Sequence, residues 1–121
     1  MDHMALGRLG ERLAVQHLKD QGWEVRARNV RHGRAEVDVV ASRGSILAFI
    51  EVKCRRTERH GHPLEAITRS KRLEVARVAR GWLRKHPIRP GVLVRFDAIS
   101  VLCPYRGPHQ LIHVPDAWRM D

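Results

Sequence analysis

Acidic side chains occur in two neighbouring apolar stretches of the chain, residues 36–40 and 46–53, which otherwise have the composition of buried strands. Asp38 lies in the first stretch, and the second contains Glu51, followed two residues later by Lys53. Because side chains alternate along a strand, Glu51 and Lys53 share one face. The short interval between the stretches predicts an antiparallel hairpin that can bring Asp38 and Glu51 together beside one lysine.

Two carboxylates at a buried strand end repel each other unless a cation lies between them. Hard oxygen ligands suit Mg²⁺ or Mn²⁺, so Asp38 and Glu51 are candidate metal ligands, and the main-chain carbonyl of Val52 can serve as a further one. A metal held in this way can activate water against a phosphodiester. Lys53 can orient or deprotonate that water, or stabilise charge in the transition state. The simpler alternative is a salt bridge between Glu51 and Lys53 at a strand end.

The chain is strongly basic. Its 121 residues contain 23 Lys and Arg against 13 Asp and Glu, which gives a net charge of +10 and an isoelectric point near 11.1. Such an excess favours a polyanionic partner, and nucleic acid, DNA before RNA, comes first. The acids alone would repel nucleic acid, so basic side chains must supply the attraction. The candidates are Arg34, Arg55, Arg56, Arg69, Lys71 and Arg72.

Composition also excludes several classes of protein. No stretch approaches the ~20 apolar residues that span a membrane and no signal peptide precedes Arg8, so we expect a cytoplasmic, nucleoid-associated protein without membrane contact. Cys54 and Cys103 form no framework, which indicates reduced thiols, and His60 and His62 lack a second pair at zinc spacing, which indicates a solvated loop. The aromatic share of 5% argues against a single-strand stacking platform built on several rings.

Residues 5–21 are predicted to form a helix that Gly22 ends. At about 100° per residue the leucines of this helix gather on one side, and Glu11 falls on that inward side. Two interpretations of Glu11 remain open. It is either a rim glutamate paired with Arg8 or Arg12, or a third carboxylate that leans over the face of the strands.

Residues 64–85 are predicted to form a long helix that stops before Pro87. Its inward row consists of Leu64, Ile67, Lys71, Val75, Val78 and Trp82. Lys71, the only polar member, either extends its stem out to solvent or points across the sheet toward the acids or a phosphate bound there. The opposite side carries a basic stripe that favours phosphate contact. The stripe consists of Arg69, Arg72, Arg77, Arg80 and Arg84.

Apolar or alternating runs predict three further strands, at residues 23–30, 91–101 and 110–114, the first of them a half-solvated edge strand. Arg95 and Asp97 lie two residues apart in the second run and favour a simple ion pair at a strand edge. The order is then helix, three strands, helix, two strands. It predicts a single α/β domain over the full 121 residues, with one mixed sheet and a helix packed on either side.

Successive blocks of the sequence resemble a single family. The blocks are Gly7-Arg8-Leu9-Gly10-Glu11, Asn29-Val30-Arg31, Glu36-Val37-Asp38, Phe49-Ile50-Glu51-Val52-Lys53-Cys54-Arg55, Ala66 with Lys71-Arg72, Arg95-Phe96-Asp97 and Asp116-Ala117-Trp118. On these blocks the chain is similar to the small bacterial YraN family of predicted endonucleases, itself distantly similar to archaeal Holliday-junction resolvases. The resemblance implies the PD-(D/E)xK nuclease superfamily and a restriction-endonuclease-like αβββαβ core.

The resemblance also implies a role for each acid. Asp38 and Glu51 would hold the metal, Mg²⁺ or Mn²⁺, and Lys53 would be the catalytic lysine. Glu11 would be the helical acid that completes the site in resolvase-like members. Glu36 belongs to the family's Gly-Glu-x-Asp block and is grouped with Lys53 as a catalytic candidate without a defined role. The chain departs from that block at the residue before Glu36, which is alanine rather than glycine.

Residues and resemblance together predict a Mg²⁺-dependent endonuclease that acts on DNA, with branched or flapped substrates of repair or recombination in view. Resolvase-like nucleases commonly work as dimers, so we expect a homodimer. The alternative is a nucleic-acid-binding protein that retains the nuclease fold and does not cut. A third hypothesis is a ribosome- or RNA-associated basic protein that uses only the arginine stripe. Metal-dependent cleavage separates the first two, and a preference for RNA at matched salt would favour the third.

Overall fold

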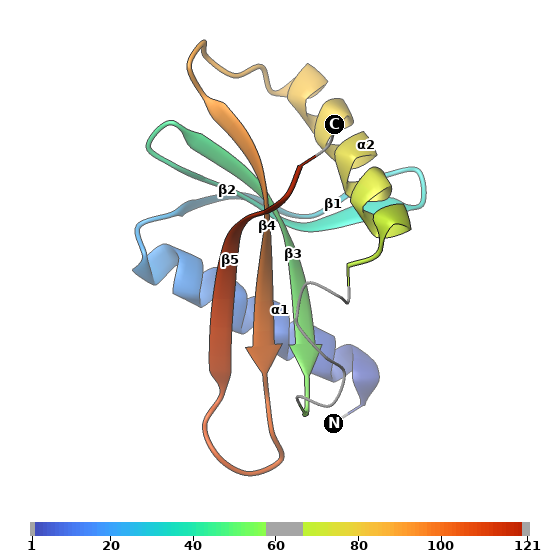
Figure 1. Cartoon of the computed structure of the whole chain (residues 1–121), viewed down its shortest axis with the longest axis vertical. Coiled ribbons are helices and arrows are strands. Elements are labelled where there is room, and N and C mark those ends of the chain that lie inside the picture. The colour runs from blue at the N-terminus through green and yellow to red at the C-terminus, as the bar shows by residue number, and fades with distance from the viewer. Residues whose placement is uncertain (1, 58–66, 120–121) are drawn as a thin grey trace.

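The computed structural model describes residues 2–57 and 67–119. In chain order these residues form α1 (His3–Asp20), β1 (Glu24–His32), β2 (Ala35–Arg43), β3 (Ile46–Arg55), α2 (Arg69–Lys85), β4 (Leu93–Leu102) and β5 (Gln110–Trp118). The strands make one sheet in the order β1–β2–β3–β4–β5 (Figure 1). Neighbouring strands are antiparallel except β3 and β4, which are parallel and are connected through α2. The predicted α/β order with one mixed sheet is confirmed.

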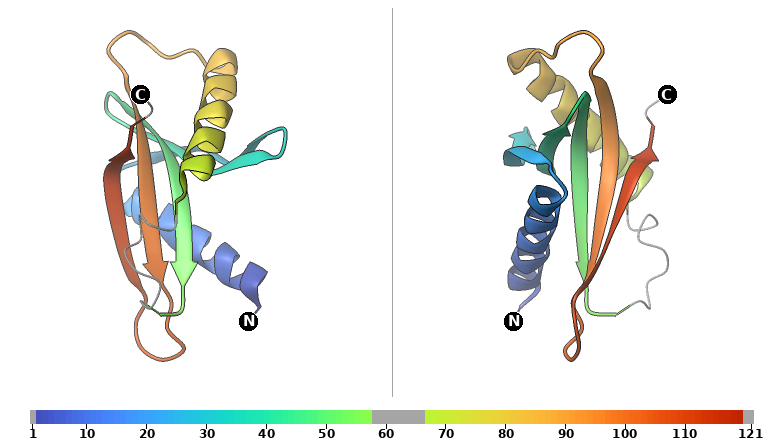
Figure 2. Two further views of the ribbon diagram at one scale, coloured as in Figure 1. Left: turned by 45° about the vertical axis from the view of Figure 1, so that its right-hand side comes forward. Right: turned by 90° about the vertical axis from the view of Figure 1, so that its left-hand side faces the viewer.

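α1 packs along one face of the sheet (Figure 2). Its first turn is capped by Asp2, whose Oδ1 accepts the Ala5 N–H at 2.7 Å. After its last turn comes Gly22 at φ +85°, a left-handed conformation that glycine adopts without strain. The helix predicted over residues 5–21 is therefore confirmed, with a start two residues earlier. The buried residues on this face are Ala14, Val15, Leu18, Trp23, Val39, Ala41, Ala48, Ile50, Ile99, Val101 and Cys103.

α2 packs on the opposite face and begins later than residue 64. The backbone of Thr68 is extended and its hydroxyl accepts the Lys71 N–H at 3.1 Å, so Thr68 is the N-cap and Arg69 the first helical residue. The predicted start of this helix and the predicted His60–His62 loop lie outside the described residues. The buried residues on this face are Ala35, Val37, Val40, Leu47, Phe49, Ile67, Val75, Val78, Ala79, Trp82, Ala98 and Trp118.

β5 runs four residues further than the predicted strand at 110–114 and continues through Pro115. β5 is an edge strand of the sheet. The missing N–H of a proline is tolerated at such an edge because no neighbouring strand needs it. Beyond the proline, Trp118 is buried and pairs with Phe96 of β4.

Asp97 of β4 is fully buried and ties β4 to β5. Its carboxylate accepts Arg95 Nε at 2.8 Å and Arg95 Nη2 at 2.9 Å, so the predicted ion pair is confirmed. The same carboxylate lies 2.8 Å from His113 Nε2 and accepts the Asp116 N–H at 3.0 Å. The pair stands on an inner strand of the sheet rather than at an edge, and it joins a larger network than the sequence indicated.

β1 is an edge strand on which partly buried residues are interspersed with exposed ones, as predicted. Together with β2 it forms a hairpin whose outer end extends beyond α2 (Figure 2, left). Among the residues described here, neither helix is both long enough and apolar enough to cross a membrane.

Candidate active site

The ladder between β2 and β3 ends at the pair Val39–Ile50, and the next residues on the two strands are Asp38 and Glu51. At this point the Val52 N–H donates to Asp38 Oδ2 at 2.7 Å. A side-chain carboxylate thus takes the place of the main-chain acceptor that would continue the ladder. The predicted hairpin is confirmed, and it brings Asp38 and Glu51 together.

On the other side of Asp38, the regular pairing of β1 with β2 skips Asp38 and Asn29. Asn29 has a φ of +51°, a left-handed conformation that asparagine tolerates better than most residues other than glycine. Both ladders beside Asp38 are therefore interrupted, and its carboxylate turns to the backbone of β3.

Glu51 is 1% exposed, and its Oε1 has no hydrogen-bond partner among the described residues. Burial, followed by the negative charge of Asp38, raises the pKa of Glu51 to about 8. Burial also raises the pKa of Asp38 to about 6, helped by the charges of Glu11 and Glu36 and opposed by the Val52 N–H. Buried carboxylates of this kind are stabilised by a proton or a cation. The pair is therefore short of positive charge.

Lys71 of α2 supplies part of that charge. Its Nζ lies 3.8 Å from Glu51 Oε2 and donates to the main-chain carbonyl of Glu36 at 3.2 Å. It also lies 3.9 Å from Glu74 Oε2, one turn along the helix. Of the two interpretations of Lys71, the side chain that points across the sheet toward the acids is the one observed.

Lys53 follows Glu51 on β3 and is half-buried. Its charge lowers the pKa of Glu51, but by less than that of Lys71. Within the described residues the ion pair to Glu51 comes from Lys71, so the simple Glu51–Lys53 salt bridge is not formed. Lys53 is thus close enough to act on Glu51 electrostatically without being bound to it.

Glu11 reaches the site from α1. Its side chain is 14% exposed and accepts Arg28 Nε at 3.4 Å and Arg28 Nη2 at 3.3 Å. The predicted pairing with Arg8 or Arg12 is therefore wrong, because the arginine comes from β1 rather than from the same helix. The charge of Glu11 raises the pKa of Asp38, which places Glu11 within electrostatic reach of the pair.

A cavity of about 400 Å³ opens between α1, the β1–β2 hairpin and β3. Its lining includes three of the four predicted acids, Glu11, Glu36 and Asp38. Glu36 is held by Arg31, whose Nε lies 2.9 Å from Glu36 Oε2. The full lining is Met4, Gly7, Arg8, Glu11, Asn29, Arg31, Glu36, Asp38 and Val52. Glu51, the fourth acid, precedes Val52 in the chain, and Val52 lines the cavity and donates its N–H to Asp38.

Arg28 and Arg31, which hold Glu11 and Glu36, are missed by reasoning from the sequence. One signal for Arg31 was present, because a tight turn centred on Gly33 and Arg34 places residues equidistant from its centre opposite each other, and Arg31 does pair with Glu36. Arg28 and Glu11 lie 17 residues apart on different elements, so only the packing of α1 on β1 brings them together.

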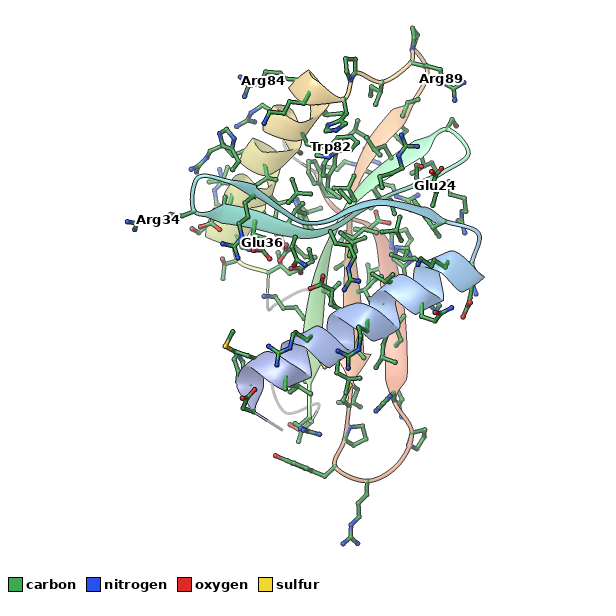
Figure 3. All side chains as sticks on the ribbon, turned by 180° about the vertical axis from the view of Figure 1, so that it is seen from behind. Glu24, Arg34, Glu36, Trp82, Arg84 and Arg89 are labelled. Atoms are coloured by element: carbon green, nitrogen blue, oxygen red, sulfur yellow. The ribbon has the colours of Figure 1, made fainter. Side chains whose placement is uncertain are left out.

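Of the predicted phosphate-binding residues, Arg34 projects from the tip of the β1–β2 hairpin (Figure 3). Arg55 ends β3, and Arg56 follows it. The guanidinium of Arg56 donates to the carbonyl of Cys103 at 3.3 Å and lies 4.2 Å from the ring centre of Tyr105. Arg34 thus precedes the start of β2, and Arg55 and Arg56 stand at and after the end of β3.

The remaining candidates belong to the first turn of α2. Arg69 is exposed, whereas Arg72 is half-buried and donates from Nε to the carbonyl of Ile67 at 3.2 Å. The guanidinium of Arg72 also lies 5.7 Å from the ring centre of Trp118. Arg72 therefore helps to hold the start of α2 in place, and Lys71 lies at the acids rather than on the basic stripe.

The donor set of the site suits a hard divalent cation. In residues 2–57 and 67–119 no group of three or more His, Cys, Asp and Glu side chains is arranged to hold a metal ion. Mg²⁺, however, commonly binds through one or two carboxylates and retains several waters. Asp38, Glu51 and the carbonyl of Val52 meet that requirement, and the unpartnered Glu51 Oε1 is an oxygen that such an ion would satisfy.

Comparison with known proteins finds one matching family model, described as uncharacterised protein family UPF0102, over residues 10–101. A UPF0102 protein of Chlorobaculum tepidum is 46% identical over 97 residues, which cover 80% of this chain and 74% of the relative. A UPF0102 protein of Leifsonia xyli is 41% identical over 110 residues, 91% of this chain and 92% of the relative. A UPF0102 protein of Rhodococcus opacus is 40% identical over 116 residues, 96% and 98% of the two chains.

Proposed function

The chain belongs to the uncharacterised protein family UPF0102, the YraN family, and we propose that it is a Mg²⁺-dependent endonuclease that hydrolyses phosphodiester bonds in DNA. The order α1–β1–β2–β3–α2–β4 is that of the αβββαβ core of the PD-(D/E)xK nucleases that the sequence resembles, with β5 as an added edge strand. The acids of the resemblance also lie on the expected elements, one on the first helix and the others on the second and third strands.

The observation that carries the proposal is the buried carboxylate of Glu51, with its unpartnered Oε1, next to that of Asp38. Two carboxyl groups whose pKa values are raised to about 8 and about 6 oppose ionisation although Lys71 and Lys53 lie near Glu51. Structural stability gives no reason to retain the second carboxyl group, that of Glu51, beside Asp38, since a hydrophobic replacement of a buried charge is often neutral or stabilising. A binding site for a divalent cation does give a reason.

When bound, Mg²⁺ or Mn²⁺ supplies Lewis-acid activation of water and neutralises charge on the phosphate. Asp38 and Glu51 hold the ion, with the Val52 N–H fixing the orientation of the Asp38 carboxylate. Lys53 orients the attacking water or stabilises the charge that develops on phosphate oxygens. Lys71 supplies part of the positive charge that Glu51 lacks in the metal-free protein, and Arg28 and Arg31 hold Glu11 and Glu36 at the wall of the cavity.

A second candidate function, a DNA-binding protein that does not cut, is favoured by one specific observation. The Lys71 ammonium already lies 3.8 Å from Glu51 Oε2 and provides a built-in cation for the acids. In that case the acids take no part in catalysis, and the protein keeps the nuclease fold but binds nucleic acid through its basic side chains alone. Metal dependence distinguishes the two functions.

For the nuclease, we propose branched or flapped DNA as the substrate and a homodimer, with one site for each cut strand, as the working form. The test incubates purified protein with a nicked duplex, a flap, a four-way junction and a supercoiled plasmid, each with Mg²⁺, Mn²⁺ or EDTA. We expect metal-dependent cleavage by the wild type and none by Lys53→Ala, which should still bind DNA. Lys19→Ala, an exposed lysine near the end of α1, is the matched control and should cut like the wild type.

Failure of the wild type to cut any of these substrates with either metal, together with retained DNA binding, would establish the binding protein and reject the enzyme. Cleavage by Lys53→Ala at the wild-type rate would leave a nuclease but reject the role given to Lys53. Tighter binding of the single-stranded RNA counterpart than of branched DNA at matched salt would favour the RNA-associated alternative.

A further inference from the structure

A second cavity, of about 640 Å³, lies between the edge strand β1 and the C-terminal half of α2. We name it the basic groove after the basic side chains in its lining, which are Arg26, Arg31, His32, Arg84, Lys85 and His86. Among the described residues its lining includes no acidic side chain, and the apolar part of its wall comes from Val30, Val78 and Trp82, among others. Of the residues from which the sequence predicts phosphate contact, Arg84 of the basic stripe lines this groove.

The imidazole rings of His32 and His86 in the basic groove are each positioned by a residue of α2. Gly81 is an interior residue of α2, where glycine is a poor helix former. A Cβ at Gly81 would lie 3.1 Å from Nδ1 of His32, so the glycine makes room for that ring. On the other side, His86 stacks on Trp82 with ring centres 4.1 Å apart, and its Nδ1 lies 3.0 Å from the Trp82 carbonyl.

The charges of the groove are only partly balanced by acids. Arg26 pairs with Glu24 at 3.5 Å, and Arg31 pairs with Glu36 at 2.9 Å. For Arg84 and Lys85 no acidic partner within 4.0 Å occurs among the described residues. Figure 3 shows Trp82 between α2 and the sheet and Arg84 on the outer side of the last turn of α2. The groove therefore offers positive charge above an apolar wall, which matches the alternating phosphates and sugars of a nucleic-acid backbone.

Arg31 belongs to both cavities, since it lines the acid-bearing one as well as the basic groove. Its side chain is 75% exposed and lies on β1, the strand that separates the two cavities. A DNA strand held at Asp38 would therefore contact Arg31 where it passes the edge of the sheet. Continuity through Arg31 is the reason to assign the groove to the same ligand as the acids.

We propose that the basic groove binds backbone phosphates of the DNA segment that flanks the one held at Asp38 and Glu51. This inference rests on the proposed function in taking DNA as the ligand. Lys71, at the acids, and Lys85, at the groove, are fourteen residues apart on one helix, a span of about 21 Å. At roughly 3.4 Å per nucleotide step, the groove contacts phosphates about six nucleotides away from the acids.

The test measures DNA binding with EDTA present, so that no cleavage occurs, at several NaCl concentrations. The variant is Arg84→Ala/Lys85→Ala, and the matched control is Arg12→Ala/Lys19→Ala, which removes two exposed cations from α1. Thermal melting and circular dichroism establish that both variants are folded. For a duplex with about ten base pairs on each side of a central nick, we expect the groove variant to bind roughly tenfold more weakly, with a salt slope lower by about 2. The control should lose no more than about threefold in affinity and should show no substrate-length effect.

The wild type and the groove variant are also compared on a nicked dumbbell, whose two stems of about four base pairs are closed by uncharged polyethylene-glycol loops so that they stay paired and end short of the groove. Here the groove variant and the wild type should bind equally. Equal binding to the long duplex with an unchanged salt slope would reject the groove and leave the nuclease proposal standing. Displacement of the DNA by poly-glutamate as effectively as by DNA would reject a nucleic-acid site in favour of a general polyanion site. A wild type that binds none of these DNAs would reject both the groove and the proposed function.

Discussion

The carboxylate of Asp38 accepts the main-chain N–H of Val52 at 2.7 Å, so a side chain closes the sheet at the point where β2 leaves β3. The same carboxylate is a proposed metal ligand. Structural and chemical roles therefore meet in one group, and substitutions that preserve the acceptor while removing the charge can separate them.

Replacement of Asp38 by asparagine should keep an oxygen acceptor for the Val52 N–H and remove the negative charge. We expect Asp38→Asn to melt at or above the wild-type temperature and to bind Mn²⁺ roughly tenfold or more weakly, as measured by calorimetric titration. Asp38→Ala leaves the N–H without its acceptor and should lower the free energy of unfolding by about 1–3 kcal/mol. Wild-type Mn²⁺ affinity in Asp38→Asn would remove Asp38 from the ligand set.

The metal-free protein should become less stable as the pH rises. The pKa of Glu51 is raised from an ordinary 4.5 to about 8, so between these values the folded state binds more protons than the unfolded state. The free energy of unfolding is then highest at the acid end of this window, falls through it and levels off above about pH 8. Asp38, with its pKa of about 6, adds to the fall in the lower part of the window. The slope for one group is at most about 1.4 kcal/mol per pH unit.

Urea unfolding in EDTA at about pH 5.5, 7 and 8.5 measures this dependence. Glu51→Gln is the control and should flatten most of the slope, because an amide does not titrate. Saturating Mg²⁺ should raise the stability most at the alkaline end, where the carboxylates are ionised. A stability that is constant or rises across this range in the wild type would contradict the raised pKa of Glu51.

The network around Asp97 should affect stability and leave chemistry intact. Burial would raise the pKa of Asp97, but the hydrogen bonds from His113, Arg95 and the Asp116 N–H outweigh it and leave the pKa lowered. The charged form is thus the stabilising one above its ordinary value of 3.8, and its contribution is lost only as the pH falls below that value. This window is separate from that of Glu51.

Asp97→Asn should lower the free energy of unfolding by roughly 3 kcal/mol or more, because it leaves the Arg95 guanidinium without its charged partner inside the sheet. Asp116→Asn, an exposed acid in the same region, should change stability by less than about 0.5 kcal/mol. Chemical denaturation at neutral pH compares the two. If Asp97→Asn is as stable as the wild type, the network does not hold β4 to β5.

Two glycines of α1 should respond in opposite directions to the same change. A Cβ at Gly10 would lie 2.5 Å from the Cβ of Cys54, so Gly10→Ala forces α1 away from β3 and should cost about 1–3 kcal/mol. At Gly7 a Cβ meets nothing within 4 Å, so Gly7→Ala should stabilise the helix by about 0.5–1 kcal/mol. The melting temperatures of the two variants, compared with that of the wild type, test this prediction. Shifts of the same sign would contradict the close approach of α1 to Cys54.

Local patterns predict most of the fold because the elements are strongly marked. The apolar run ending at Glu51 and the short interval before it are sufficient for the β2–β3 hairpin, and the opposite placement of α1 and α2 follows from their apolar faces. α2 begins at Arg69 because Thr68 acts as its N-cap, which the apolar periodicity of the sequence does not mark. The end of β5 was misplaced because Pro115 ends most strands, but not an edge strand.

The candidate site is predictable in composition and less so in its partners. The alternation of side chains and the register of the β2–β3 hairpin place Asp38 and Glu51 together. Both the alternation and the register follow from residues close to the single turn that joins the two strands. The partners of the acids depend on packing between elements. Sequence proximity favoured Lys53 for Glu51 and Arg8 or Arg12 for Glu11, whereas Lys71 and Arg28 make those pairs from α2 and β1.

β3 is hydrogen-bonded to β4 from Ile46 to Arg55, but its ladder with β2 stops at Val39. Beyond that residue the strand pairing of the β1–β2 hairpin is internal, and side chains make the further links: Asp38 accepts the Val52 N–H, and Lys71 donates to the Glu36 carbonyl. One wall of the acid-bearing cavity is therefore held by the main-chain ladder of the sheet, and the opposite wall by side-chain hydrogen bonds and by packing against α2. A ligand that widens the opening would therefore have to displace Lys71 or the apolar contacts of Ala35 and Val37 beneath α2, so the width of the opening is coupled to the packing of the core.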